Sequence, residues 1–264
     1  MRTIVIGITV LFLAALVEIA PAREGKIKQE FHQTYKLSAK GTISLRNVNG
    51  DVQIKVWDKN DVQVDAVKYA SDQEDMDNLK IEVDVSADMI DIDTEYPKHE
   101  GDHQGGETAV EYVLTVPKDV NIDEIKTVNG GIEIPGVSGE VRASTVNGTI
   151  KADGLVNTCE LKTVNGSVEA GFATVPPEAN VRLESVNGAL TIHLPDNVNA
   201  NLRAKAQTGN LKSDFDLTLK GDGDTHSFVR IGTSVKGTIG KGGAEIEMST
   251  VNGSIRILKA GGAD

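Results

Sequence analysis

The stretch TVNGTIKADG at residues 145–154 is followed by TVNGSVEAGF at residues 163–172, so the chain repeats nearly the same segment. The triplet Val-Asn-Gly also recurs elsewhere, and the asparagines at 129, 147, 165 and 187 are spaced by 18, 18 and 22 residues. Spacing near about twenty residues is typical of folds in which equivalent segments stack on one another. The repeat therefore predicts a stacked architecture.

The apolar pattern changes phase at each Asn-Gly pair. Val141 and Ala143 lie six and four residues before Asn147, whereas Ile150 and Ala152 lie three and five residues after it. Apolar residues two apart predict strands with one buried face. Because the offsets are even before the asparagine and odd after it, a straight strand would turn its core outward. The chain must therefore turn at Asn-Gly.

Two all-β architectures accommodate such turns, and Asn-Gly is the pair that most readily takes a positive φ. Each triplet is either the hairpin of an antiparallel meander or a corner of a β-solenoid. Identical residues at one coil length favour the solenoid, a single-sheeted right-handed β-helix-like repeat, because parallel stacking sets Asn on Asn. The predicted turn residues are Asn49, Gly50, Asn129, Gly130, Asn147, Gly148, Asn165, Gly166, Asn187, Gly188, Asn252 and Gly253.

The N-terminus has the pattern of a secretory signal peptide over residues 1–22. Arg2 precedes an apolar run from Ile4 to Val17, and the small residues Ala20-Pro21-Ala22 follow. An uncleaved anchor is the alternative. We expect an exported protein, either periplasmic or at the cell surface, with no membrane insertion after cleavage. Cys159 is the only cysteine, so no internal disulfide can form.

The remaining chain divides into segments that differ in their pattern of apolar and polar residues. We expect a linker at residues 23–36, the β-solenoid domain at 37–258 and a tail at 259–264. Within the domain, alternating apolar residues over 58–120 predict an antiparallel segment near the N-terminus. Residues 121–258 carry the repeats, including a degenerate copy from Leu202 to Leu211 in which Thr208-Gly209 replaces Asn-Gly.

Charge is unevenly distributed along the chain. The net charge is −12, and residues 58–124 carry 20 acids and 5 lysines, or −15, which leaves +3 for the rest. A nucleic-acid binder needs a basic surface, and an anionic lipid surface repels acidic segments. The composition therefore argues against both kinds of partner.

Four ordered motifs resemble the bacterial putative-adhesin family, a domain of unknown function found in exported and envelope-associated proteins. They are NVNGDVQIKVWDKNDVQVDAVKYA at 47–70, VEYVLTVPKDVNI at 110–122, GGIEIPGVSGEVRASTVNGTI at 130–150 and GGAEIEMSTVNGSIRI at 242–257. The resemblance covers residues 37–258. It implies a β-solenoid-like fold and an extracytoplasmic location, and it brings no catalytic residues.

The sequence offers few candidates for chemistry. His99, Glu100, Asp102 and His103 are metal-ligand types, but they lie in a Gly-rich loop that does not preorganise them. Trp57 is expected to pack at an edge rather than bind sugar, and Cys159 to be buried. Thr127, Thr145, Thr163 and Thr250 share the parity of the buried set, so they should point inward. We expect no catalytic, cofactor-binding or metal-binding residues.

These observations predict a non-enzymatic structural or interaction module, adhesin-like, at the bacterial cell envelope. The expected partner is an envelope protein or glycan, with the loop at 96–108 as the first place to look. One alternative is a polysaccharide-active β-helix enzyme, because outward columns such as Arg142, Glu160 and Arg182 carry charges. A second alternative is a self-assembling envelope protein, because free edges and identical coils favour stacking.

Overall fold

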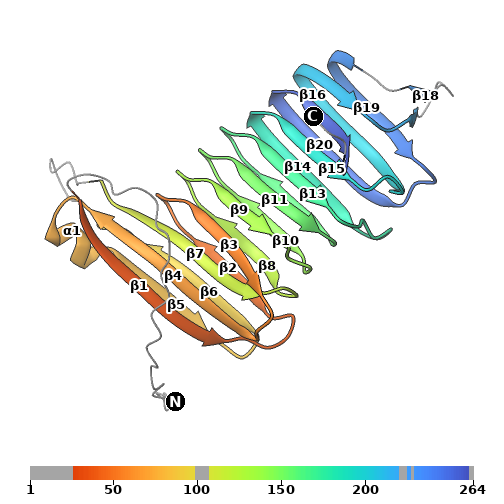
Figure 1. Cartoon of the computed structure of the whole chain (residues 1–264). Helices are drawn as coiled ribbons and strands as arrows, with labels where there is room; N and C mark the ends of the chain where they lie inside the picture. Colours follow the sequence, from red (N-terminus) through yellow and green to blue (C-terminus); the bar gives the residue numbers. More distant parts are fainter. Residues whose placement is uncertain (1–25, 99–106, 220–224, 227–228, 262–264) are drawn as a thin grey trace, which may run out of the picture.

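The computed structural model describes residues 26–98, 107–219, 225–226 and 229–261. Figure 1 shows an elongated body made almost entirely of strands, with one short helix, α1 (Gln73–Asn78), at its N-terminal end. The strands form one sheet that wraps into two faces. No helix in these ranges is both long enough and apolar enough to span a membrane.

Face A and face B are the two layers of the wrapped sheet. In spatial order, face A contains β5 (Lys80–Val85), β6 (Met89–Glu95), β2 (Thr42–Arg46), β8 (Asn121–Lys126), β10 (Val141–Ser144), β12 (Cys159–Lys162), β14 (Asn180–Asn187) and β20 (Ala244–Asn252). Face B contains β1 (Ile27–Lys36), β4 (Asp61–Ala70), β7 (Ala109–Pro117), β3 (Val52–Trp57), β9 (Ile132–Pro135), β11 (Ile150–Leu155), β13 (Val168–Phe172), β15 (Leu190–Leu194) and β21 (Ile255–Lys259). Long β16 (Ala200–Ser213) ends both faces, and β19 (Val229–Ile239) runs antiparallel to it, beside the short β17 (Leu217–Leu219) and β18 (Thr225–His226).

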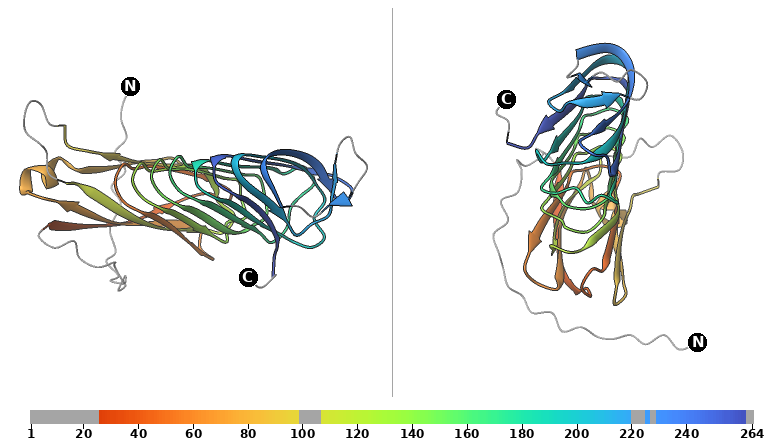
Figure 2. Two further views of the ribbon diagram at one scale, coloured as in Figure 1. Left: turned by 90° about the horizontal axis from the view of Figure 1, so that it is seen from above. Right: turned by 90° about the vertical axis from the view of Figure 1, so that its right-hand side faces the viewer.

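Each Val-Asn-Gly triplet is a corner that joins a strand of face A to a strand of face B. The strands on either side of Asn147, β10 and β11, pair with neighbouring coils and not with each other. Isolated parallel bridges join Asn49 to Asn129, Asn129 to Asn147, Asn147 to Asn165 and Asn165 to Asn187. The β-solenoid prediction is therefore confirmed, and the hairpin meander is excluded. Figure 2 shows the stacked coils from the side and almost along their axis.

The order of coils in space differs from their order in the chain. After β15 the chain passes to β16, the outermost coil, and then returns to insert β20 and β21 between β14–β15 and β16. The degenerate copy does keep the repeat phase, because Thr208 lies beside Asn252.

Two expectations near the N-terminus need correction. Residues 27–36, expected within a linker, form β1, which pairs along its whole length with β4. Its alternate residues Phe31 and Tyr35 pack against the core, which holds the strand in place. The segment 58–120 is only partly antiparallel, because β6 and β7 run parallel to β2 and β3 and so form a coil of the solenoid themselves.

The interior is a continuous column of Ile, Leu, Val and Ala from both faces. Cys159 is fully buried between its register neighbours Val141 and Val181. Burial raises the pKa of its thiol, so the side chain behaves as a small hydrophobe, as predicted.

Candidate interaction surfaces

The corner asparagines form a continuous hydrogen-bonded ladder along one edge of the solenoid. Each amide Nδ2 donates to the Oδ1 of the preceding asparagine in space at 2.8 Å. The members, in spatial order, are Asn49, Asn129, Asn147, Asn165, Asn187 and Asn252. Because every bond points the same way, each amide is polarised by its neighbours. These amides are already engaged with one another, so the asparagines act first as scaffold.

Different side chains close the two ends of the ladder. At one end Asn49 Nδ2 donates to the Thr108 carbonyl at 3.1 Å, and the Tyr96 hydroxyl accepts from the Asn49 backbone N–H at 2.9 Å. At the other end the Thr208 hydroxyl donates to Asn252 Oδ1 at 2.9 Å. The residue spacing in the sequence predicts the ladder, but it does not predict these end groups.

The role of the corner glycines differs from the expected one. No corner asparagine has a positive φ, and Gly130, Gly148, Gly188 and Gly253 also lie outside that region. A Cβ added to Gly148 would lie 1.9 Å from the carbonyl oxygen of Gly130, and the other stacked corners are equally tight. Close stacking of backbone on backbone is therefore the requirement that all the corner glycines share. Only Gly50 and Gly166 also have a positive φ, of 128° and 159°.

The residues two before each asparagine point inward, as predicted. Thr145 donates its hydroxyl to the Gly130 carbonyl at 2.9 Å, and Thr163 donates to Gly148 at 3.0 Å. Thr127, Ser185 and Thr250 make the equivalent bond. All five are buried, so they do not form an exposed threonine row.

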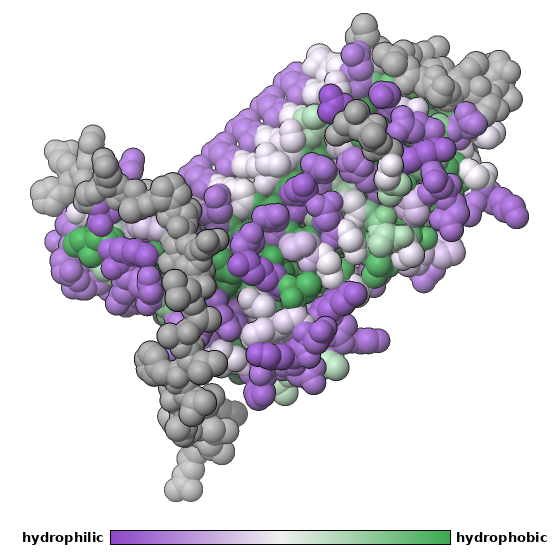
Figure 3. Space-filling view, viewed as in Figure 1, coloured by the Kyte–Doolittle hydropathy of each residue, from purple (hydrophilic) through white to green (hydrophobic). Residues whose placement is uncertain are grey.

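The valines of the triplets form an outward stripe beside the asparagine ladder. Val48, Val186 and Val251 are 38%, 40% and 38% exposed, and Val128, Val146 and Val164 are half-buried. We call the valine stripe and the asparagine ladder together the corner edge. Figure 3 shows evenly spaced hydrophilic residues along the upper edge of the molecule, a pattern that stacked identical corners produce. The sequence contained the signal for this stripe, because each valine has the opposite parity to its buried threonine.

The charges on face A alternate across the coils. The strand register places Arg142, Glu160, Arg182, Glu247 and Arg203 side by side in that order. Arg182 bonds Glu247 at 2.8 Å, which raises the pKa of the guanidinium, and Arg142 bonds Asp123 at 2.7 Å. The column is a charge-paired, solvated face, and it brings no pair of free carboxylates together.

The other candidate residues do not form a metal-binding or sugar-binding site within the described part of the chain. His99, Glu100, Asp102 and His103 lie outside the described residues, as does most of the loop at 96–108. Within the described ranges no three metal-ligating side chains cluster. Trp57 donates its Nε1–H to the Asp61 carbonyl at 2.7 Å, and the Lys59 ammonium lies 4.5 Å from its ring centroid. Trp57 is the last residue of β3, and a lysine ammonium lies over its ring.

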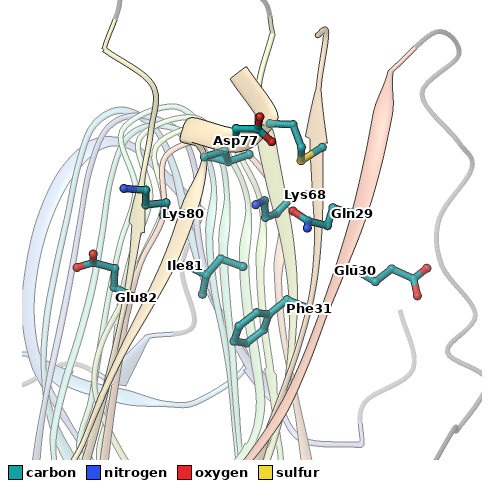
Figure 4. A pocket seen from close by; sticks show the side chains of 10 residues that line it. Gln29, Glu30, Phe31, Lys68, Asp77, Lys80, Ile81 and Glu82 are labelled. Carbon is teal, nitrogen blue, oxygen red and sulfur yellow. The ribbon is translucent and has the colours of Figure 1, made fainter. Parts of the chain in front are cut away.

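A groove of about 490 Å³ opens at the N-terminal end between β1 and β5 (Figure 4). Phe31 and Ile81 face each other across it, and Lys68 and Asp77 lie near its mouth beside α1. Burial lowers the pKa of Lys68, and Asp77 opposes that shift. No pattern in the sequence predicts this groove.

One solved structure shares this fold. A putative cell adhesion protein from Clostridium sporogenes superposes with a TM-score of 0.53 at 15% identity, over 89% of this chain and 100% of that one. A putative adhesin from Bacteroides fragilis gives a TM-score of 0.27 at 11% identity, over 87% of this chain and 97% of the other. No curated protein matches the chain.

The first of these likenesses supports the fold alone, because its sequence identity is low. Family membership rests on the sequence itself, since the profile of one family matches residues 34–258, which include every coil of the solenoid. The chain therefore belongs to the Toastrack DUF4097 family.

Proposed function

We propose that this protein is an exported, non-enzymatic, adhesin-like module that binds a protein of the bacterial cell envelope through its corner edge. The observation that carries the proposal is the valine stripe, which places one outward valine per coil along the edge, three of them exposed and three half-buried. Exposed apolar residues in a continuous row are a feature of protein-binding surfaces. The adhesin names of the structural neighbours agree with this role.

A protein partner fits the corner edge better than a glycan does. Sugar-binding sites use aromatic rings as stacking platforms, and the corner edge has none. Each flanking asparagine amide already uses one of its two N–H donors and one oxygen lone pair in the ladder, which leaves one of each for a sugar. A partner with an elongated apolar face would cover the valines and leave the ladder intact.

An enzymatic role has weaker support. In most glycoside hydrolases two carboxylates lie at a fixed distance around the bond that is cleaved. The outward carboxylates of face A instead pair with arginine and lysine, as in Glu247 with Arg182 and Glu184 with Lys162. New reducing ends after incubation with acidic glycans would overturn the non-enzymatic proposal.

The binding proposal is tested with beads coated with the purified chain and mixed with isolated envelopes. The double variant Val146→Lys/Val186→Lys should lose binding. The matched control Thr191→Lys, on outward face B, should retain it, and both variants should melt as the wild type does. Protease treatment of the envelopes should abolish binding.

Binding that survives protease and is lost after periodate oxidation would identify a glycan instead. Equal binding by the valine variant and the control would remove the corner edge from the proposal. A variant lacking residues 99–106, which keeps Tyr96 and Thr108, tests the loop separately.

A further inference from the structure

The strands at the two ends of the solenoid are paired differently. At the C-terminal end β19 runs antiparallel to β16 and so interrupts the parallel stacking of coils. At the N-terminal end β1 pairs only with β4 and β5 only with β6, among the described residues. Their outer edges carry backbone donors and acceptors that a further strand can pair with. The N-terminal end is thus the open end.

The inner side of this end is apolar and incompletely covered. Phe31 and Tyr35 of β1, with Ile81 and Val83 of β5, pack against the core but remain partly exposed. The groove of about 490 Å³ lies between them, with Phe31 on one wall and Ile81 on the other (Figure 4). A strand added at this end would cover these side chains.

The two free edges differ in charge. β5 carries Glu82 and Asp84 outward, and Asp91 and Asp93 follow on the adjacent β6. An acidic edge repels a second copy of itself, which is a common protection against edge pairing. β1 carries charges of both signs, Lys28, Glu30 and Lys36. Within the chain, Lys28 lies 2.9 Å from Glu30, and Lys36 lies 2.7 Å from Asp61 of β4, so Glu30 and Lys36 would share these partners with a second copy. Self-pairing is therefore favoured at β1 and opposed at β5.

We propose that the N-terminal end is a homodimer interface, in which β1 pairs antiparallel with β1 of a second copy about a twofold axis at Gln33. This register sets Glu30 opposite Lys36 of the second copy, and Phe31 opposite Tyr35. His32 then faces Thr34. Because the pairing is symmetric, each opposite-charge pair and each aromatic pair occurs twice. Cross-strand pairs of these two kinds are the ones that stabilise antiparallel sheets.

Charge selects this register over the nearest alternatives. A twofold axis at His32 would set Lys28 opposite Lys36 of the second copy, and an axis at Thr34 would set His32 opposite Lys36. Neither places a carboxylate across from Lys36. The axis at Gln33 also brings the two half-buried aromatic residues of β1 together over the groove. Because each copy uses the same edge, this contact is self-complementary, so by itself it joins two copies and does not propagate into a filament. The inference stands independently of what the corner edge binds.

Charge exchange tests the interface. Sedimentation velocity of the purified chain should show a dimer that dissociates on dilution. Lys36→Glu or Glu30→Lys alone should weaken the dimer about tenfold or more, because like charges then face each other twice. The double variant Glu30→Lys/Lys36→Glu should restore it. An equimolar mixture of the two single variants should form a heterodimer, since both facing pairs are then opposite in charge.

Cysteine cross-linking supplies a second readout that does not depend on charge. Gln33 would face its own copy at a Cα separation of about 4.5–5.5 Å, which a disulfide can bridge. Gln33→Cys should therefore give a covalent dimer on mild oxidation, whereas Thr34→Cys should not. Buried Cys159 serves as the internal negative control.

A monomer at all concentrations together with no Gln33→Cys dimer overturns the proposal. A dimer whose affinity is unchanged by the substitutions at Glu30 and Lys36 overturns this interface. A dimer that cross-links through Phe31→Cys instead of Gln33→Cys overturns this register. Binding of an added peptide to β1 of a monomeric chain would show that the edge takes a different partner.

Discussion

Asn147 donates its amide to Oδ1 of Asn129 at 2.8 Å and accepts the amide of Asn165 at the same distance. The three residues come from successive coils, so this chain of bonds runs along the solenoid axis, across the strands that each coil contributes. It joins the corners just as the backbone bonds join the faces. The consequences for stability can be measured one residue at a time.

Replacing Asn147 with Ala should interrupt the ladder. Two side-chain bonds are lost at an edge that water can reach, so we expect a loss of about 1 kcal/mol in unfolding free energy. For a chain of this size that corresponds to a fall in melting temperature of about 2–4 °C. Asn210→Ala is the control, because its exposed side chain makes no hydrogen bond within the described ranges. Equal melting of the two variants would contradict a stabilising ladder.

Gly130 and Gly131 test whether glycine is needed at the corner for close stacking of the coils or for the conformation of the turn. A Cβ at Gly130 would lie 2.1 Å from the Gly50 carbonyl oxygen, whereas at Gly131 the nearest atom is 3.3 Å away. Gly130→Ala should therefore destabilise the chain by about 3 kcal/mol, and Gly131→Ala by less than about 1 kcal/mol. Chemical denaturation measures both. Similar values would show that close stacking is not the reason for glycine at the corner.

Reversing the charge of Glu247 tests the order of the coils. Glu247 lies between Arg182 and Arg203, so Glu247→Arg would place three arginines side by side. We expect a lower melting temperature at low salt, and the loss should shrink as ionic strength rises. Glu245→Arg is the matched control. Glu245 lies on the same outward side of β20, but its side chain bonds Asn201 instead of an arginine. A salt-independent effect at Glu247 would point to packing rather than charge.

Lys68 should give a pH-dependent effect. Burial lowers its pKa in the folded chain, so the charged form costs stability. That cost is complete at neutral pH and disappears as pH rises past the ordinary lysine pKa of 10.5. Lys68→Met should thus raise the melting temperature at pH 7 by about 1–2 °C, because most of the group is screened by solvent.

The gain from Lys68→Met should shrink as the pH approaches 10.5, and exposed Lys55→Met should show no such trend. Melting curves at low protein concentration, across that pH range, measure both. A gain that grows with pH would contradict the assigned burial effect.

Much of the fold follows from local pattern. The parity change at Asn147 and the spacing of its copies were enough to predict corners, inward threonines such as Thr163 and a buried Cys159. Each of these depends only on which side of a strand a residue occupies. β1 escaped prediction because Phe31 and Tyr35 are embedded among polar residues, and only the uncovered edge of β4 gives them something to pack against.

The sequence by itself determined the coil, because its side-chain period and its Asn-Gly corners are properties of neighbouring residues along the chain. Only the tertiary structure decided the order of the coils, with β20 inserted beside β14 so that Glu247 separates Arg182 from Arg203. It also decided that the corner glycines allow the backbones of successive coils to stack closely, and that β1 ends the sheet with a free edge. These features depend on contacts between residues far apart in the chain, and near-identical coils do not encode in their local pattern which of their copies they will lie against.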